Sequence, residues 1–268
     1  FAQQITQSMG QSVIVENRPG AAQNIAAEYV ARARKDGYTL LMTSPAFTNN
    51  VSLYSKLNYD PIKDFAPVAL VGVSPYFLLV HPSCPATNVA EFVAFVKKNP
   101  GKLNFSSSGM GTASHLSGEL FKLMIKTDIT HVPYKGGAPC MTALAVKEVD
   151  FTFCPITTAQ PLMVSGKVRA IGIASAKRSP LMPELQTMIE GGLPGFVSQA
   201  WIGLLAPAGT PGDVIGALNA VIVQASQKPD IRARLEKMGT DPVSETPEYF
   251  GKLLLEEIDR WDPVVKAA

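Results

Sequence analysis

The feature that most constrains the fold is a repeated alternation of short apolar runs with segments of helical period. Residues 38–43 form a near-continuous apolar run, as expected of a strand buried on both faces, and they follow a segment with helical spacing at 24–34. The same alternation continues as far as residue 174. It predicts an α/β fold with mostly parallel sheets.

These patterns, together with local start and stop signals, predict the individual elements. Strands are expected at 12–16, 38–43, 65–73, 76–80, 103–107, 129–134, 150–154, 168–174 and 201–206. Helices are expected at 24–34, 88–98, 112–126, 138–147, 157–165, 211–227, 230–238 and 246–260.

The chain is predicted to divide into two lobes. Beyond residue 176, a passage rich in Pro and Gly leads into one strand and then three helices, which have no strands of their own and must pack on an existing sheet. The N-terminal sheet has fewer strands, so we expect it to receive them. This predicts a clamshell of two lobes joined by two chain crossings, with lobe one at 1–73 and 205–268, lobe two at 80–197, and hinge crossings at 74–79 and 198–204.

The composition is that of a soluble globular protein. The 268 residues include 24 Lys and Arg against 22 Asp and Glu, a net charge of +2, and 46% of them are hydrophobic. A charge so near zero offers no concentrated basic face, so we expect no nucleic acid and no direct membrane insertion. Because Phe1, Ile5 and Met9 have helical spacing, the chain opens within a helix. We expect a preceding strand and any export signal to lie outside this sequence.

Metal and cofactor sites are not expected. Cys84, Cys140 and Cys154 have neither C-x-x-C spacing nor clustered histidines, and they are either small buried hydrophobes or, for Cys140 and Cys154, a disulfide. Gly109 and the glycine two positions later begin a dinucleotide fingerprint, but Ser114 stands at its third glycine position. The sequence therefore predicts no nicotinamide or flavin.

The most informative segment runs from Ser106 to His115, where a strand passes through a turn of small residues into a helix. The first turn of a helix has unpaired N–H groups and a partial positive charge, and glycine lets an anion approach the backbone closely. This predicts an anion site. The alternative is an ordinary capped turn, with Thr112 or Ser114 closing the start of the helix.

Three further turns of small and hydroxyl-bearing residues follow predicted strands, at 43–48, 134–138 and 154–157. Ligands of open α/β sheets collect beyond the carboxyl ends of the strands, so we expect these turns to converge on one site. Lys135 either adds a positive charge there or is a solvated surface lysine. Phe47 and Tyr134 either form an apolar wall or belong to the core.

Evidence for catalysis is poor. The sequence has no G-x-S-x-G, H-E-x-x-H or P-loop motif, and His81, His115 and His131 are each interpreted as structural. A hydrolase or transferase that uses His115 with Ser107 or Ser114 is the alternative, but the sequence offers no acid to orient the histidine. We therefore predict that the chain is not an enzyme.

Six ordered segments resemble one known family over nearly the whole chain: VENRPGA (15–21), DGYTLL (36–41), YDPIKDFAPV (59–68), SGMGTASHL (108–116), HVPYKG (131–136) and LLAPAGTP (204–211). They are similar to the Bug proteins, the substrate-binding proteins of tripartite tricarboxylate transporters. The resemblance implies a periplasmic receptor with a two-lobed periplasmic-binding-protein (Venus flytrap) fold, which captures a small carboxylate and delivers it to membrane transporter subunits. We expect this receptor to be a monomer whose two lobes close on the ligand. A receptor that presents its ligand to a signalling partner is the alternative.

The resemblance also implies a set of ligand-facing positions and places the family's glycine-rich loop before the start of this sequence. The implied positions are Ser44, Ala46, Phe47, Thr48, Ser107, Ser108, Gly109, Gly111, Thr112, Ala113, Ser114, Tyr134, Lys135, Gly136, Cys154 and Pro155. Many relatives carry an acidic residue where this sequence has Cys154, and an ammonium group would need that acceptor. We therefore expect a dicarboxylate or an aromatic carboxylate and not an amino acid.

Overall fold

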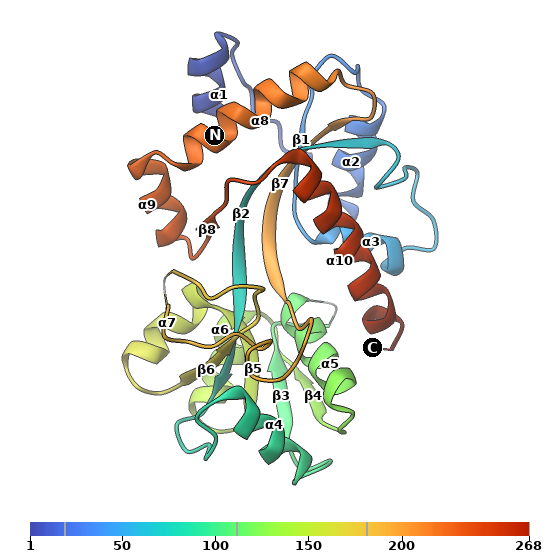
Figure 1. The fold of residues 1–268 in the computed structure, drawn as a ribbon. Coiled ribbons are helices and arrows are strands. Elements are labelled where there is room, and N and C mark those ends of the chain that lie inside the picture. Colours follow the sequence, from blue (N-terminus) through green and yellow to red (C-terminus); the bar gives the residue numbers. More distant parts are fainter. Residues whose placement is uncertain (19, 111, 181, 268) are drawn as a thin grey trace. The chain divides into compact units, whose positions relative to one another are not determined.

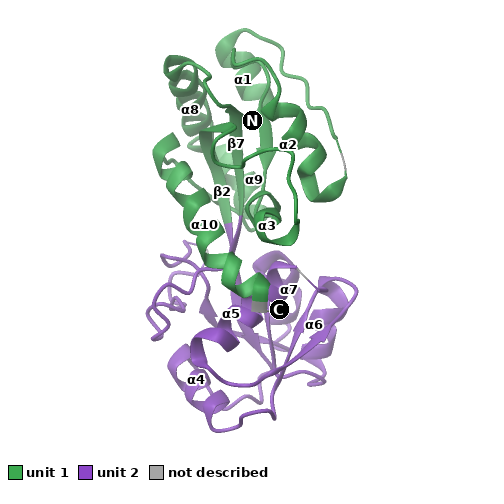
Figure 2. Ribbon diagram, turned by 90° about the vertical axis from the view of Figure 1, so that its right-hand side faces the viewer, with its two compact units in different colours: residues 1–73, 201–266 green, residues 74–200, 267–268 purple. Residues whose placement is uncertain are grey.

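The computed structural model describes residues 1–18, 20–110, 112–180 and 182–267. The chain forms two compact units (Figure 2). Unit 1 comprises Phe1–Val73 and Trp201–Lys266, and unit 2 comprises Ser74–Ala200 and Ala267–Ala268.

Helices and strands alternate along the chain, as the apolar patterning predicts (Figure 1). The elements up to the first crossing are α1 (Ala2–Met9), the 3-10 helix η1 (Ala21–Gln23), α2 (Asn24–Ala31), β1 (Leu41–Thr43), α3 (Ala46–Leu53) and β2 (Phe65–Val80). Unit 2 continues with α4 (Val89–Lys97), β3 (Asn104–Ser107), α5 (Ala113–Ile125), β4 (Thr130–Pro133), α6 (Gly137–Ala145), β5 (Phe151–Pro155), α7 (Ile156–Val164) and β6 (Arg169–Ile173). The chain then forms β7 (Gln199–Pro207), α8 (Gly212–Ser226), α9 (Pro229–Lys237), β8 (Asp241–Pro242) and α10 (Pro247–Ala267).

The strands form open, mixed sheets, in the order β1-β7-β2-β5-β3-β4, with β6 and β8 also paired to β2. In unit 2, β3 is parallel to β4 and to β5, while β2 is antiparallel to both β5 and β6. Strands β3 to β6 therefore run in one direction and β2 in the other. In unit 1, β1 is antiparallel to β7, and β8 is antiparallel to β2. The predicted α/β fold class is confirmed.

The sheet of unit 1 is covered on both faces, and the alternation along β7 shows how. Trp201 and Leu205 are buried in one apolar cluster with Phe250 of α10, whereas Leu204 is buried in another with Ile215 of α8. Successive side chains of a strand point to opposite faces, so α10 and α8 cover opposite faces of this sheet. Helix α1 lies beside α8 (Figure 1).

The sheet of unit 2 has one face covered by aromatic rings. Six buried phenylalanines, each with a ring contact to at least one of the others, form this layer: Phe92, Phe105, Phe121, Phe151, Phe153 and Phe196. On the opposite face, Cys154 of β5 packs with Met141 and Leu144 of α6. Each fully buried side chain of this size contributes roughly 1.5–3 kcal/mol, so both layers stabilise unit 2.

Two expectations about the strands were wrong. The strand predicted at 12–16 does not form, and Ile14 is 88% exposed, because no strand of the described residues pairs with this segment. The strands predicted at 65–73 and 76–80 are one continuous strand, β2. Pro75 does not end the strand, because the chain stays extended and the N–H of Tyr76 bonds to the carbonyl of Ser198 at 3.1 Å.

Candidate functional site

The loop that joins β3 to α5 forms the centre of the candidate site. It is tied to the end of β4 by two backbone hydrogen bonds, from Tyr134 N–H to Ser107 O at 2.9 Å and from Gly136 N–H to Ser108 O at 3.1 Å. Strands β3, β4 and β5 are parallel, so their carboxyl ends meet at one edge of the sheet. This edge brings together the predicted turns at 107–114, 134–136 and 154–155.

Helix α5 begins without a side-chain cap. Thr112 stands at the N-cap position, but its side chain makes no capping hydrogen bond to the backbone of the helix. Its hydroxyl donates instead to Gly109 O at 2.6 Å. The hydroxyl of Ser114 accepts from Ser108 N–H at 2.9 Å, so it too turns away from the helix. The capped-turn alternative is therefore not what the structure shows, and the first amides of α5 keep their capacity to bind an anion.

Glycine is required at two positions of these loops. Gly109 has a φ of 133° and Gly136 a φ of 111°, values that residues with a Cβ rarely adopt. A Cβ built on Gly136 would meet nothing within 4 Å, so this glycine faces open space. The glycines thus shape the loops and leave the backbone accessible.

The side chains of the predicted contact residues in unit 2 differ in exposure. Ser107 and Ser114 are buried, Lys135 is exposed, and Ser108, Gly109, Thr112, Ala113, Tyr134, Gly136 and Pro155 are partly buried. Gly111 lies outside the described residues. The structure gives the backbone geometry of this loop, as described above. That its glycines and hydroxyl groups contact a ligand stays a prediction.

Cys154 has its side chain in the apolar core of unit 2. It is 4% exposed, and burial raises the pKa of its thiol to about 12. Pro155 follows it and stands at the N-cap position of α7. All three cysteines are free thiols, so Cys140 and Cys154 form no disulfide. A neutral thiol at this position offers no acceptor of the strength that an ammonium group needs.

The predicted contact residues of unit 1 lie at the start of α3, which the sequence patterns did not predict. Phe47 is 0% exposed, and its ring stacks on Tyr59 with a centroid separation of 5.8 Å. It therefore belongs to the core and not to an apolar wall. Ser44 accepts a hydrogen bond from Gln23 Nε2 at 2.6 Å, and Thr48 donates to the carbonyl of Pro45 at 3.0 Å. Ala46, the first residue of α3, is partly buried.

A network of amide side chains, which sequence reasoning missed, stabilises this part of unit 1. Asn50 donates to Ala22 O at 2.8 Å and to Asn24 Oδ1 at 2.7 Å, and Tyr59 donates to the same Asn24 oxygen at 2.7 Å. Ala22 and its neighbours Ala21 and Gln23 all have positive φ. The sequence shows two adjacent asparagines, Asn49 and Asn50, in this segment. Their presence alone does not reveal which groups they bond to.

The histidines do not form a catalytic arrangement with the loop serines. Ser107 Oγ lies 2.6 Å from Nε2 of His131, not of His115, and Ser107 is fully buried. The carboxylate of Glu119 lies 3.9 Å from Nε2 of His115. The acid therefore lies beside His115, whereas the hydroxyl of Ser107 lies beside His131. Ser107 and Ser114 are both buried, so neither is an exposed nucleophile for the hydrolase alternative.

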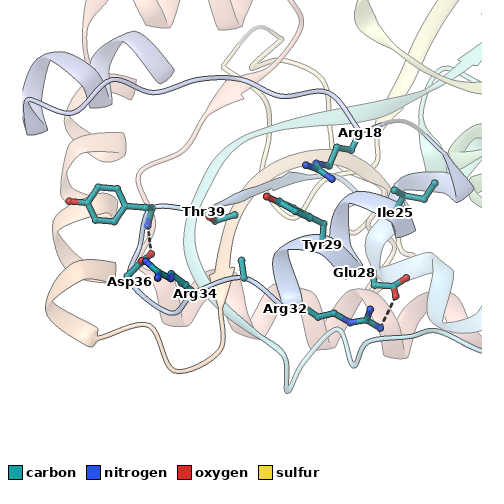
Figure 3. A pocket seen from close by; sticks show the side chains of 10 residues that line it. Arg18, Ile25, Glu28, Tyr29, Arg32, Arg34, Asp36 and Thr39 are labelled. Carbon is teal, nitrogen blue, oxygen red and sulfur yellow. Dashed lines mark hydrogen bonds and ion pairs between the residues drawn. The ribbon is translucent and has the colours of Figure 1, made fainter.

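Two surface pockets lie in unit 1, and no described residue of the predicted contact set lines either of them. One, of about 980 Å³, is shown in Figure 3, where Arg18 stacks over the ring of Tyr29 at 3.5 Å. Glu16 pairs with Arg18 at 2.8 Å and Glu28 with Arg32 at 2.7 Å, so two of its three arginines are already neutralised. The other, of about 1120 Å³, is lined mainly by apolar side chains. Neither resembles a dedicated anion site.

Among the residues that the structure describes, no group of three or more His, Cys, Asp or Glu side chains is arranged to hold a metal ion. In the same part of the chain, no helix combines the length and the apolarity that crossing a bilayer requires.

An open α/β fold with an uncapped helix start among small residues is typical of proteins that bind small anions. The chain belongs to the TctC family: the model of the "Tripartite tricarboxylate transporter family receptor" matches residues 1–268. The predicted family is thus confirmed. This is a family of periplasmic solute-binding receptors and not of enzymes.

Relatives of known sequence or structure agree with this assignment. A Pseudomonas sp. protein described as "UPF0065 protein in tcbD-tcbE intergenic region" is 34% identical over 266 residues, which cover 99% of this chain and 79% of the relative. MatC (Rpa3494) from Rhodopseudomonas palustris, with bound malate, is 37% identical with a TM-score of 0.70, covering 98% of this chain and 91% of that one. R. palustris Rpa4515 with adipate is 35% identical with a TM-score of 0.73, covering 99% and 89%.

Proposed function

We propose that this chain is a periplasmic receptor that binds a small aliphatic dicarboxylate at the start of α5 and delivers it to a tripartite tricarboxylate-type transporter. The observation that carries the proposal is the uncapped start of α5 behind a loop held open by Gly109. Two similar proteins of known structure hold dicarboxylates, malate and adipate, which supports this ligand class.

The backbone of α5 offers binding energy of the right size. Each charge-assisted hydrogen bond contributes roughly 1.5–3 kcal/mol, and a micromolar dissociation constant corresponds to about 8 kcal/mol. Two or three amides at Ala113 and Ser114 and in the preceding loop therefore supply much of a micromolar affinity. Lys135 is exposed beside Gly136, whose N–H bonds the loop, and it adds positive charge for a second carboxylate.

Two observations support an aliphatic dicarboxylate within the expected ligand class. An aromatic ligand would gain from an apolar wall, but the ring of Phe47, the candidate for that wall, is buried in the core of unit 1. Cys154 remains as an argument against an amino acid, because its buried thiol is neutral. An aliphatic dicarboxylate fits both observations.

A substitution at Ala113 tests the site directly. Ala113 is the first residue of α5, where proline is tolerated, and Thr112 has φ −73° and ψ 160°, a conformation that the residue before proline prefers. Ala113→Pro thus removes one N–H while the helix is kept. We expect at least a tenfold loss of affinity for malate or adipate by calorimetry.

Gly212→Pro is the matched control, because it places proline at the first position of α8, where a Cβ meets nothing within 4 Å. It should leave affinity unchanged. Failure of the wild type to bind malate, adipate or related dicarboxylates at millimolar concentration contradicts the proposal, as does tighter binding of glutamate or of benzoate.

The two-lobe organisation, with hinge crossings at 74–79 and 198–204, is also part of the proposal. A ligand closes a clamshell only if it binds the closed form more tightly than the open one. Small-angle scattering should therefore show a smaller radius of gyration with ligand than without. A tight ligand that leaves the scattering unchanged rejects closure, and loss of ligand uptake on deletion of the gene distinguishes delivery to a transporter from signalling.

A further inference from the structure

The hydroxyl of Ser107 links strand β4 to the loop in front of α5. It lies 2.6 Å from Nε2 of His131, and it accepts a hydrogen bond from Gly109 N–H at 3.2 Å. Gly109 O in turn accepts from the hydroxyl of Thr112 at 2.6 Å and from its N–H at 3.3 Å. A continuous chain of hydrogen bonds therefore joins His131 to the residue that precedes α5.

The imidazole of His131 is held firmly enough to transmit this constraint. Its ring is stacked between Phe105, with a centroid separation of 4.7 Å, and His115, with a separation of 4.0 Å. Phe105 is fully buried and His115 nearly so. The ring therefore cannot turn away from Ser107 without displacing two packed neighbours.

We propose that His131 is a positioning residue for carboxylate binding, which fixes the Ser107 hydroxyl and through it the backbone of Gly109 and the start of α5. The inference rests on the proposed function, because it assigns a role within that anion site. His131 does not touch the ligand. It reduces the cost of ordering the loop when the anion binds.

The surroundings of His131 keep its ring uncharged at neutral pH. His115 and Lys122, both on α5, act on the charge of His131, and Glu119 of the same helix acts on His115 and pairs with Lys122, while β3 contributes the uncharged Phe105 and Ser107. Burial, aided by His115 and Lys122, lowers the pKa of His131 to about 4. Its Nε2 therefore donates to Ser107 or accepts from it according to the tautomer, and in both cases the hydrogen bond is kept.

Two substitutions separate the hydrogen bond from the ring stack. His131→Phe keeps an aromatic ring between Phe105 and His115 but removes the bond to Ser107, whereas His131→Gln keeps a group that can pair with the hydroxyl. Ser107→Ala removes the hydroxyl alone and serves as a second, milder variant. His81→Phe is the matched control, because it removes a similar contact, Nδ1 to Ser83 Oγ at 2.8 Å, at an exposed site elsewhere in unit 2.

The first measurement is made without ligand. Hydrogen exchange and the ¹H–¹⁵N signal of the Gly109 amide should change in His131→Phe and Ser107→Ala, change little in His131→Gln, and stay unchanged in His81→Phe. The second measurement is the affinity for malate and for adipate at pH 7.5. We expect about tenfold weaker binding in His131→Phe and Ser107→Ala, and no further loss in the double variant.

The two measurements distinguish the two proposals. If hydrogen exchange and the ¹H–¹⁵N signal of the Gly109 amide are the same as in the wild type in both His131→Phe and Ser107→Ala, the positioning role is overturned. Wild-type affinity for malate and adipate in both variants also overturns it. If the wild type binds no dicarboxylate, the proposed function fails. The Gly109 amide then still decides whether His131 orders the loop.

Discussion

Gly118 of α5 lies directly against the ring of Phe105: a Cβ built on Gly118 would come within 2.0 Å of Cε2 of that ring. This close approach sets the distance between α5 and β3. It also supports His131, because the same Phe105 ring stacks on the imidazole. A single glycine thus affects both the packing of unit 2 and the loop that begins α5.

Replacing Gly118 with alanine should therefore be destabilising, although alanine is the better helix former. Phe105 is fully buried, so its ring has no free space to move into, and overpacking of this kind costs roughly 1–3 kcal/mol. Urea unfolding should show this loss for Gly118→Ala. Gly216→Ala in α8 is the control, since its Cβ meets nothing within 4 Å, and it should gain roughly 0.5–1 kcal/mol. Equal stability of the two variants contradicts the argument.

The pH dependence of stability should depend on His131. Its pKa is lowered from 6.5 to about 4 in the folded protein, mainly by burial. Between these values the unfolded chain binds a proton that the folded protein does not, so the free energy of unfolding falls as the pH is lowered from 6.5 towards 4. The pKa of His115 is lowered in the same direction.

Substitution of His131 isolates its share of this effect. His131→Phe removes the titrating group, so its free energy of unfolding should fall less steeply over the same range than that of the wild type. Thermal or urea unfolding at intervals from pH 7 to pH 4.5 measures the two slopes. Identical slopes would show that His131 does not resist protonation in the fold.

The sequence predicted most of the fold because the apolar periodicity is strong where elements are buried. The turn from β3 into α5 was predicted because a run of small residues between a strand and a helix is typical of a tight turn at the edge of the sheet. The prediction of a strand at 12–16 was wrong, because this apolar run has no partner strand in the described part of the chain. Periodicity reports the preference of a segment and not the presence of its partner.

The candidate site was less predictable, because its order comes from side-chain contacts that are distant in sequence. Ser107 and His131 are 24 residues apart, and Asn50 and Ala22 are 28 apart. No spacing rule connects such pairs. Phe47 shows the same limit, because an aromatic residue after a strand is equally suited to a pocket wall and to a core, and only packing on Tyr59 decides between them.

Glu257 should be essential to the stability of unit 1. Its carboxylate is 1% exposed and accepts from Trp201 Nε1 at 3.3 Å and from Trp261 Nε1 at 3.1 Å, and it pairs with Arg260. Burial raises its pKa, while Arg260 and the two indoles oppose that rise. Glu257→Ala leaves two indole N–H groups and a guanidinium without their acceptor, and we expect a loss of about 3–5 kcal/mol in chemical unfolding.

The neighbouring carboxylate provides the comparison for Glu257. Glu256 lies on the same helix, but its pair with Lys252 is largely exposed. Glu256→Ala should cost less than about 1 kcal/mol. A similar cost for the two alanine variants would mean that the indole contacts contribute little.

Replacing the amide of Asn50 with a carboxylate of the same shape should destabilise unit 1, because it turns a hydrogen-bond donor into an acceptor. Its amide donates to two acceptors, Ala22 O and Asn24 Oδ1, and the side chain is 0% exposed. Asn50→Asp keeps the shape but places a buried carboxylate against two oxygens. We expect a loss of about 3 kcal/mol or more at pH 7, since an unpaired buried charge costs at least as much as a broken buried pair.

The pH distinguishes this charge effect from a simple loss of packing. Protonation neutralises the new Asp and restores one donor, so the stability gap between Asn50→Asp and the wild type should narrow as the pH falls towards 4. Asn58→Asp is the control, because Asn58 is exposed and its amide donates to the carboxylate of Glu28 at 3.1 Å. It should cost less than about 1 kcal/mol at pH 7. A gap for Asn50→Asp that stays constant with pH would show that the amide network, and not the charge, determines the loss.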